Sequence, residues 1–344
     1  KPVLKRFSDP VHKCREAAVS MISCFLQRVT DVTPIIAYMF PALMQRIPAD
    51  VGYDPDIQLF VHNLEEHEAY KRGKAVDRQD RSNVYVHHVV ESSEEIRFEL
   101  CRLIDHLLDL LQRHNTYSVL HPYFNETVLF VQTHLRDPFP ELKVLACEVL
   151  TKLARIPHYE LGLRHFAVAL TRATLPVLRH RHARVRAAAV RCVHTLVAVP
   201  NRDKCRGAGT EGIADLVGFR EENVLPVAAF YKPDVLINYL AELVIDHSAQ
   251  VRHATATMLA DWLTTLPDRY DHQARLLPYL LDLVCDDAAN VSEVALDGLI
   301  RCGELYEEEH PDEIIERRQY GVDGDRRINL SKPLPPPFKE RPRI

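Results

Sequence analysis

One segment matches a cofactor-binding pattern: the run from Gly207 to Gly212, Gly-Ala-Gly-Thr-Glu-Gly, fits GxGxxG. In a dinucleotide-binding protein such a run joins a β-strand to a helix, whose N-terminus then holds the pyrophosphate. Here the run follows a polar stretch, 201–206, downstream of a long expected helix, so the preceding strand is missing. We interpret the glycines as a flexible loop, and we predict no cofactor.

Histidine and carboxylate side chains could bind a metal or transfer protons, and the chain holds 18 histidines. The closest pairs, His87/His88 and His180/His182, lack an HExxH motif or an array of supporting carboxylates. Arginines surround the second pair, and their charge disfavours a cation. The acidic run 307–313 has the composition of a solvated helix end. No Ser/His/Asp or Cys/His grouping can be assembled, so we predict no catalytic residue, no metal site, no small-molecule substrate and no enzyme activity.

The densest positive cluster has a different use. It contains Arg172, Arg179, Arg181, Arg184, Arg186 and Arg191. Three interpretations stay open: a solvated helix surface, a docking patch for an acidic protein segment, and a phosphate-binding face for RNA. Nucleic acid is the least favoured, because no aromatic side chains for base stacking are interleaved with the arginines. The cluster is our candidate protein-docking patch.

The composition is that of a folded protein, with 47% hydrophobic and 26% charged residues and a net charge of −5. None of the eight cysteines forms a CxxC pair, and six fall in apolar helical patterns, so we expect reduced, buried thiols in a cytoplasmic protein. No run of about eighteen apolar residues predicts a membrane span. Because the chain opens on Lys1-Pro2 within a helical pattern, we expect a fragment of a longer protein.

A repeated layout indicates the fold. Six segments share a turn followed by a helix start that carries a basic residue. In four of them the basic residue stands six places after an acidic turn residue; these pairs are Asp9/Arg15, Glu91/Arg97, Asp137/Lys143 and Asp246/Arg252. His180 replaces the acid in a fifth copy, and Ser292 replaces the base in the last. The spacing of about 40–47 residues is typical of HEAT and armadillo repeats.

Each repeat is expected to be a helical hairpin, which gives an all-α fold, an α-solenoid. The turn acid can cap the second helix, and the arginine can reach a turn acid of its own or of the neighbouring repeat. We expect such partly exposed pairs to contribute well under ~1 kcal/mol each, so that apolar faces stabilise the array. The predicted second helices are at about 11–28, 94–113, 140–154, 183–198, 249–265 and 290–306, and the first helices at about 35–47, 124–135, 165–179, 233–245 and 273–285.

Two insertions and a tail interrupt this period. The solenoid is expected over residues 1–316, with insertions at about 49–91 and 200–231. Residues 317–344 contain basic side chains and three consecutive prolines, which favour an extended polyproline II tail.

The repeats resemble the HEAT family from about residue 1 to 316. Three segments are also similar to the HEAT-repeat factors that assist the assembly of axonemal dynein arms: Ser8–Glu16, Phe40–Arg46 and Val90–Arg97. In those factors a short loop joins the last two motifs, whereas here some forty residues separate them. The resemblance implies a non-enzymatic cytoplasmic scaffold of motile-cilium biology that binds dynein heavy or intermediate chains and chaperones.

Two other functions stay open. A transport or phosphatase-type HEAT adaptor would bind short peptide motifs along a concave groove. A HEAT protein that binds RNA or a membrane would use the arginine cluster, and its binding would depend steeply on salt. We expect protein partners, with neither nucleic acid nor membrane among them.

Overall fold

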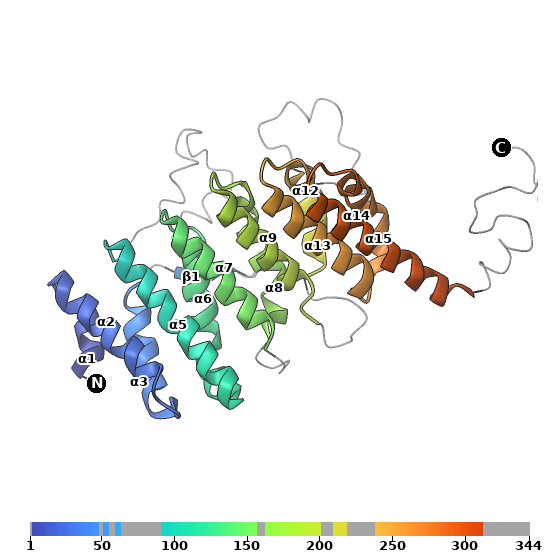
Figure 1. The fold of residues 1–344 in the computed structure, drawn as a ribbon. Coiled ribbons are helices and arrows are strands. Elements are labelled where there is room, and N and C mark those ends of the chain that lie inside the picture. Colours follow the sequence, from blue (N-terminus) through green and yellow to red (C-terminus); the bar gives the residue numbers. More distant parts are fainter. Residues whose placement is uncertain are drawn as a thin grey trace, which may run out of the picture.

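The computed structural model describes residues 2–47, 51–54, 59–62, 91–156, 162–200, 209–218 and 238–311. The described helices form two layers, and the second helices of successive hairpins lie side by side in a row from α2 to α15 (Figure 1). That row consists of α2 (His12–Leu26), α5 (Glu94–His114), α7 (Pro140–Ala154), α9 (Ala183–Val197), α13 (Ala249–Thr265) and α15 (Ala289–Glu309). The prediction of an all-α solenoid is confirmed.

The first helices form the layer behind (Figure 1). They are α3 (Thr33–Met44), α6 (Phe124–His134), α8 (Ala167–Thr174) with its 3-10 extension η4 (Leu175–Arg179), α12 (Tyr239–Val244) and α14 (Arg269–Val284). Shorter elements complete the described chain: α1 (Pro2–Lys5), η1 (Arg6–Ser8), η2 (Tyr117–Tyr123), η3 (Leu163–His165) and α10 (Glu211–Val217). The second helices begin at or within a residue of their predicted starts.

The insertion after α3 contains two short strands that the sequence pattern did not predict. Strand β1 (Val51–Asp54) pairs antiparallel with β2 (Leu59–His62), with Val51 opposite His62. Residues 55–58 and 63–90 of this insertion lie outside the described residues, as do most of the insertion at 200–231 and the whole tail 317–344. The predicted bounds of the solenoid, insertions and tail stay predictions.

Leucine, alanine and β-branched side chains fill the space between the two layers. Small residues let neighbouring second helices approach closely: Ala187, Ala188 and Ala189 of α9 are all buried. Trp262 of α13 is fully buried, and its indole N–H donates to the His194 carbonyl of α9 at 3.1 Å. The array is therefore held by apolar contacts between adjacent hairpins, as repeat architectures require.

The cysteines depart from the expectation of buried thiols. Cys101, Cys147 and Cys192 are buried, but Cys14, Cys24 and Cys285 are exposed. Periodicity places a cysteine in a helix without showing which of its sides a neighbour covers. In the described residues α2 contacts one other second helix, α5, which leaves part of its surface open.

Candidate functional site

The predicted turn residues form a ladder of ion pairs from one hairpin to the next. Arg15 Nε and Nη2 donate to the two carboxylate oxygens of Glu91, at 2.8 and 2.9 Å, while its Nη1 donates to the Asp9 carbonyl of its own turn at 2.9 Å. Arg97 does the same with Asp137 and the Glu91 carbonyl. The same two-point contact joins Arg186 to Asp246 and Arg252 to Asp286. Each arginine thus bonds its own turn through a carbonyl and the next turn through a carboxylate.

The carboxylates of the ladder also organise the turns. Asp137 Oδ1 accepts the backbone N–H of Phe139 at 2.8 Å, and Asp246 Oδ1 accepts that of Ser248 at 2.8 Å. These bonds hold the N-cap residues Phe139 and Ser248 at the entry to the second helix, so the turn acid orders the turn and does not accept from the first-turn N–H groups, as a helix cap would. Burial of the pairs exceeds the expectation of partial exposure: the Asp137 side chain is 0% exposed and that of Arg97 is 8% exposed.

The ladder is interrupted between α7 and α9. Lys143 stands at the arginine position, and its Nζ donates to the Leu135 carbonyl at 3.3 Å. His180 stands at the acid position, and its Nδ1 faces the His182 N–H at 3.1 Å, where an aspartate oxygen would accept. Burial, followed by the positive charges of Lys143, His182, Arg181 and Arg186, lowers the pKa of His180. A neutral His180 accepts the turn hydrogen bond, as an aspartate would, but it cannot form an ion pair with Lys143. Burial lowers the pKa of Lys143 itself.

Protonation of His180 is therefore expected to destabilise this junction. Because the pKa of His180 is lower in the folded chain than its ordinary value of 6.5, the unfolded chain binds more protons as pH falls below that value. The stability of the wild type then falls from about pH 7 downwards. His180→Asn keeps an acceptor for the His182 N–H and does not titrate, so its stability falls less over the same range. Urea unfolding at about pH 7.5 and about pH 5.5 measures the difference.

The control is His247→Asn, because His247 is an exposed histidine one residue after the turn acid of the next hairpin. That variant should keep the wild-type pH dependence. Equal pH dependence of the wild type and His180→Asn would contradict a neutral His180 at this turn.

The arginines of the predicted docking patch are dispersed. Four of the six pair with a carboxylate: Arg172 with Asp215, Arg179 with Glu242, Arg184 with Glu141 and Arg186 with Asp246. Arg181 and Arg191 are exposed and have no ion-pair partner in the part of the chain that the structure describes. The sequence cluster therefore presents less free positive charge than its composition indicates.

Part of the patch lines a pocket of about 420 Å³ between η4 and α12. Arg179, Arg181 and Arg186 belong to its lining, together with Asp246 and Ile245. Ile245 is 73% exposed. Arg172, Arg184 and Arg191 lie outside this pocket. An exposed isoleucine beside arginines is a combination that suits a protein partner.

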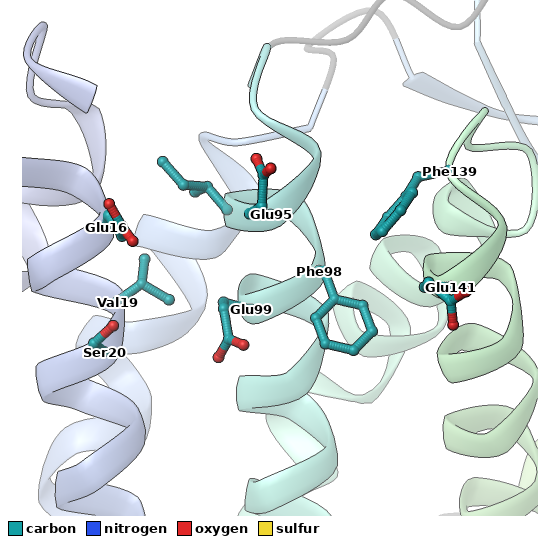
Figure 2. A pocket seen from close by; sticks show the side chains of 9 residues that line it. Glu16, Val19, Ser20, Glu95, Phe98, Glu99, Phe139 and Glu141 are labelled. Atoms are coloured by element: carbon teal, nitrogen blue, oxygen red, sulfur yellow. The ribbon is translucent and has the colours of Figure 1, made fainter. Parts of the chain in front are cut away.

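A second pocket, of about 360 Å³, lies on the row of second helices, across α2, α5 and α7 (Figure 2). Its lining residues are Glu16, Val19, Ser20, Glu95, Ile96, Phe98, Glu99, Phe139 and Glu141, and we name this surface the acidic groove. It combines apolar side chains with four carboxylates and contains no basic lining residue.

The sequence prediction missed the acidic groove. A signal was present, because Glu95 and Glu141 each stand two places before the basic residue of their repeat. Equivalent positions in neighbouring hairpins lie side by side, so an acid at this register in two adjacent repeats indicates a short acidic strip across α5 and α7. Single glutamates on a helix have the more common interpretation of solvated surface, which concealed the strip.

The glycine-rich run has a packing role in the described residues. Glu211 begins α10, and no strand precedes it at 209–210. A Cβ added at Gly212 would lie 2.7 Å from the Thr171 methyl of α8, and one at Gly209 would lie 2.5 Å from the Leu196 carbonyl. These glycines let α10 approach α8 and α9, which replaces the interpretation as loop flexibility; Gly207 lies outside the described residues.

Within the described ranges, no group of three or more His, Cys, Asp and Glu side chains is placed to bind a metal ion. The helices of those ranges also include none with the length and apolarity needed to cross a bilayer. Among the pockets of the described surface, one is lined by carboxylates without a basic residue and one is lined by arginines together with Glu242 and Asp246.

The sequence matches the family described as Dynein axonemal assembly factor 5-like, TPR repeats, over residues 1–55, 82–208 and 222–317. The chain belongs to the dynein axonemal assembly factor 5-like family. This membership confirms the resemblance seen in the repeat turns. The hairpins of this family member recur at 46 residues from Arg97 to Lys143 and at 43 from Lys143 to Arg186, which is longer than the 34 residues of a TPR unit and typical of HEAT repeats.

Named relatives agree with the family. The chain is 24% identical to Dynein axonemal assembly factor 5 of Xenopus laevis over 94% of its own length and 30% of the relative's. It is 20% identical to the protein of that name from Homo sapiens, over 99% of its length and 31% of the relative's. The chain thus spans about a third of the length of these relatives.

An engineered protein of known crystal structure has the same fold, with a TM-score of 0.51 at 10% identity over 88% of this chain and 96% of that one. The likeness at this identity extends to the solenoid arrangement alone. Family and fold together identify a repeat protein whose relatives are named as factors of axonemal dynein assembly.

Proposed function

We propose that this chain is a protein-binding segment of a factor that assists the assembly of axonemal dynein arms. The observation that carries the proposal is the family match, which extends over most of the solenoid. In this proposal the chain acts in the cytoplasm without catalysing a reaction, and it holds dynein heavy or intermediate chains while chaperones complete them.

The architecture supports such a role physically. A solenoid offers an extended surface to which each hairpin contributes a few contacts, so a large and partly assembled client can be held at several points. The acidic groove and the arginine-lined pocket supply two chemically different points on one array. Weak contacts at separate sites multiply through effective concentration, which gives affinity together with ready release.

Affinity capture tests this function directly. The purified chain is immobilised and exposed to cytosol from ciliated cells that are building axonemes, at about 50 mM and about 200 mM salt. We expect axonemal dynein heavy or intermediate chains in the retained fraction at both salt concentrations. Retention of nucleic acid that leaves at the higher salt, or of short-motif cargo without dynein chains, would contradict the proposal.

The arginine patch has its own test, and the structure selects the residues to change. We propose that Arg181 and Arg191 belong to a docking surface for acidic segments of the client. Reversal of both charges, Arg181→Glu with Arg191→Glu, should lower the retained dynein about two- to thirtyfold, since each exposed ionic contact contributes about 0.2–1 kcal/mol. Ion-paired arginines such as Arg186 are unsuitable, because their replacement would also open the ladder.

The matched control reverses two exposed arginines elsewhere: Arg28→Glu lies just beyond the end of α2, and Arg113→Glu lies in the last turn of α5. Both double variants should keep the wild-type circular dichroism and melting temperature. Equal loss of dynein in the two double variants would show that net charge, and not this patch, governs retention.

A further inference from the structure

We propose that the acidic groove binds a basic and apolar segment of a partner protein, in which lysine or arginine side chains flank a leucine-sized or aromatic side chain. The inference specifies partner chemistry, so it rests on the proposed protein-binding role. It does not require that the partner be a dynein chain. Three features of the groove carry it: an apolar floor, a rim of carboxylates, and unbalanced negative charge.

The floor is built where neighbouring second helices meet. Val19 of α2 and Ile96 of α5 line the groove but are only 1% and 2% exposed, so the apolar surface open to a ligand comes from the phenylalanines beside them. Phe98 points from α5 toward α7, where Phe139 approaches it edge-on with ring centres 6.3 Å apart (Figure 2). Both rings are partly exposed. A bound apolar side chain would therefore replace water against preformed apolar surface.

The rim places carboxylates on both sides of this floor. Glu16 stands on α2 and Glu99 on α5, with the space between these helices separating them (Figure 2). Glu95 lies at the start of α5, and Glu141 lies on the far side at the start of α7. The groove has two spaces that can hold an apolar side chain, one between α2 and α5 and one between α5 and α7. A basic side chain next to that apolar side chain would meet a carboxylate in either case.

The charge at this rim is not balanced by the chain itself. Glu99 pairs with Arg102 at 2.9 Å, and Glu141 pairs with Arg184. Glu16 and Glu95 have no ion-pair partner among the described residues. Hydrogen bonds from its own backbone N–H and from the Ser93 hydroxyl lower the pKa of Glu95, and the charges of His12 and Arg97 lower it further. Two carboxylates without an ion-pair partner beside apolar surface attract a cationic segment and repel phosphate, which favours a basic peptide over nucleic acid and anionic membranes as the occupant.

Three synthetic peptides of about fourteen residues test the chemistry, a length that spans the three helices. The first alternates lysine and arginine with leucine and phenylalanine. The second replaces its basic residues with glutamate, and the third keeps the basic residues but replaces leucine and phenylalanine with serine. We expect the first peptide to bind the full chain in fluorescence anisotropy, with affinities at least tenfold lower for the other two. Equal binding of the first and third peptides would reduce the groove to a nonspecific acidic surface and overturn the proposal.

Variants locate the binding. The double change Glu16→Gln with Glu95→Gln removes the two free charges without a change of shape, and it should weaken the first peptide about three- to tenfold. The control removes two exposed charges from α15, Glu304→Gln with Glu308→Gln, and should bind like the wild type. Equal weakening in both variants would overturn the assignment to the groove. Phe98→Leu, which keeps an apolar side chain in a folded helix, should weaken the first peptide while sparing the salt dependence of binding.

The failure of this inference is distinguishable from failure of the proposed function. If cytosolic dynein chains are retained by the wild type and by Glu16→Gln/Glu95→Gln alike, and the first peptide does not bind, the groove proposal is wrong and the assembly role stands. If the peptide binds at the groove and no dynein chain is retained, the partner chemistry stands and the assembly role fails.

Discussion

Arg97→Met is expected to lower the free energy of unfolding of the N-terminal hairpins by about 3 kcal/mol, the lower bound of the usual cost of breaking a buried ion pair. Arg97 Nε and Nη2 hold both oxygens of Asp137 at 2.7 and 3.0 Å. Methionine fills much of the arginine stem's volume but leaves the Asp137 carboxylate, which is 0% exposed, without its cation. The cost is that of an uncompensated buried charge and not the loss of one surface contact.

The matched control lies five residues along the same helix. Arg102 is exposed and pairs with Glu99 three residues earlier, so Arg102→Met should cost at most about 1 kcal/mol. Both variants are unfolded with urea and followed by far-ultraviolet circular dichroism. Similar midpoints for the two variants would contradict the buried-pair account.

The single tryptophan adds a spatial test to this prediction. Trp262 lies in α13, several hairpins away from Arg97, and its emission reports the C-terminal part of the array. In a solenoid each repeat contacts only its neighbours, so a local defect lowers local stability first. In Arg97→Met we therefore expect an early step in circular dichroism that Trp262 emission does not share. Coincident loss of both signals would show that the array unfolds as one unit.

Trp262→Ala is the second large effect, with an expected cost of about 3–5 kcal/mol. The indole is fully buried among α9, α13 and their neighbours, and its N–H satisfies the His194 carbonyl at 3.1 Å. Truncation leaves a cavity at the centre of the interface and removes the donor of that carbonyl. Trp262→Phe keeps most of the volume and loses the donor, so it should cost about 1–2 kcal/mol.

The control for Trp262 is Leu296→Ala on α15, because Leu296 is 46% exposed. It should change the midpoint of urea unfolding little. If the urea midpoint of Trp262→Ala lay near that of Leu296→Ala, the predicted cost would be wrong. The surrounding helices would then close around the smaller side chain.

The helix starts could be predicted because their determinants are local. Asp137 and Asp246 sit two residues before the backbone N–H groups that they accept, and this short-range geometry is written in the sequence. The partner of each arginine was not predictable. Arg15 can reach a group of its own turn and a group of the next, and only the packed array shows that it uses both, Asp9 through the carbonyl and Glu91 through the carboxylate.

The arginine cluster and the acidic groove both depend on non-local packing, so the sequence predicted the first only in part and did not predict the second. The arginine cluster is dense in sequence, yet Arg172 and Arg184 are paired by residues 43 positions away, Asp215 and Glu141. The acidic groove shows the reverse situation. Glu16 and Glu99 are far apart in sequence, and the contact between α2 and α5 places them on one groove. Periodicity identifies the exposed side of each helix, while the neighbours decide which charges stay free there.

The interruption at Lys143 and His180 has a mechanical consequence. A guanidinium that grips a carboxylate with two parallel hydrogen bonds resists rotation of one hairpin against the next, because both bonds must bend together. The ammonium of Lys143 makes a single contact, to the Leu135 carbonyl, and offers no such torsional resistance. The α7–α9 junction therefore lacks the two-point contact of its neighbours and, among the described residues, has only the exposed ion pair of Arg184 with Glu141 in its place, so we expect the superhelical twist to adapt to a bulky client there more readily than at the other junctions.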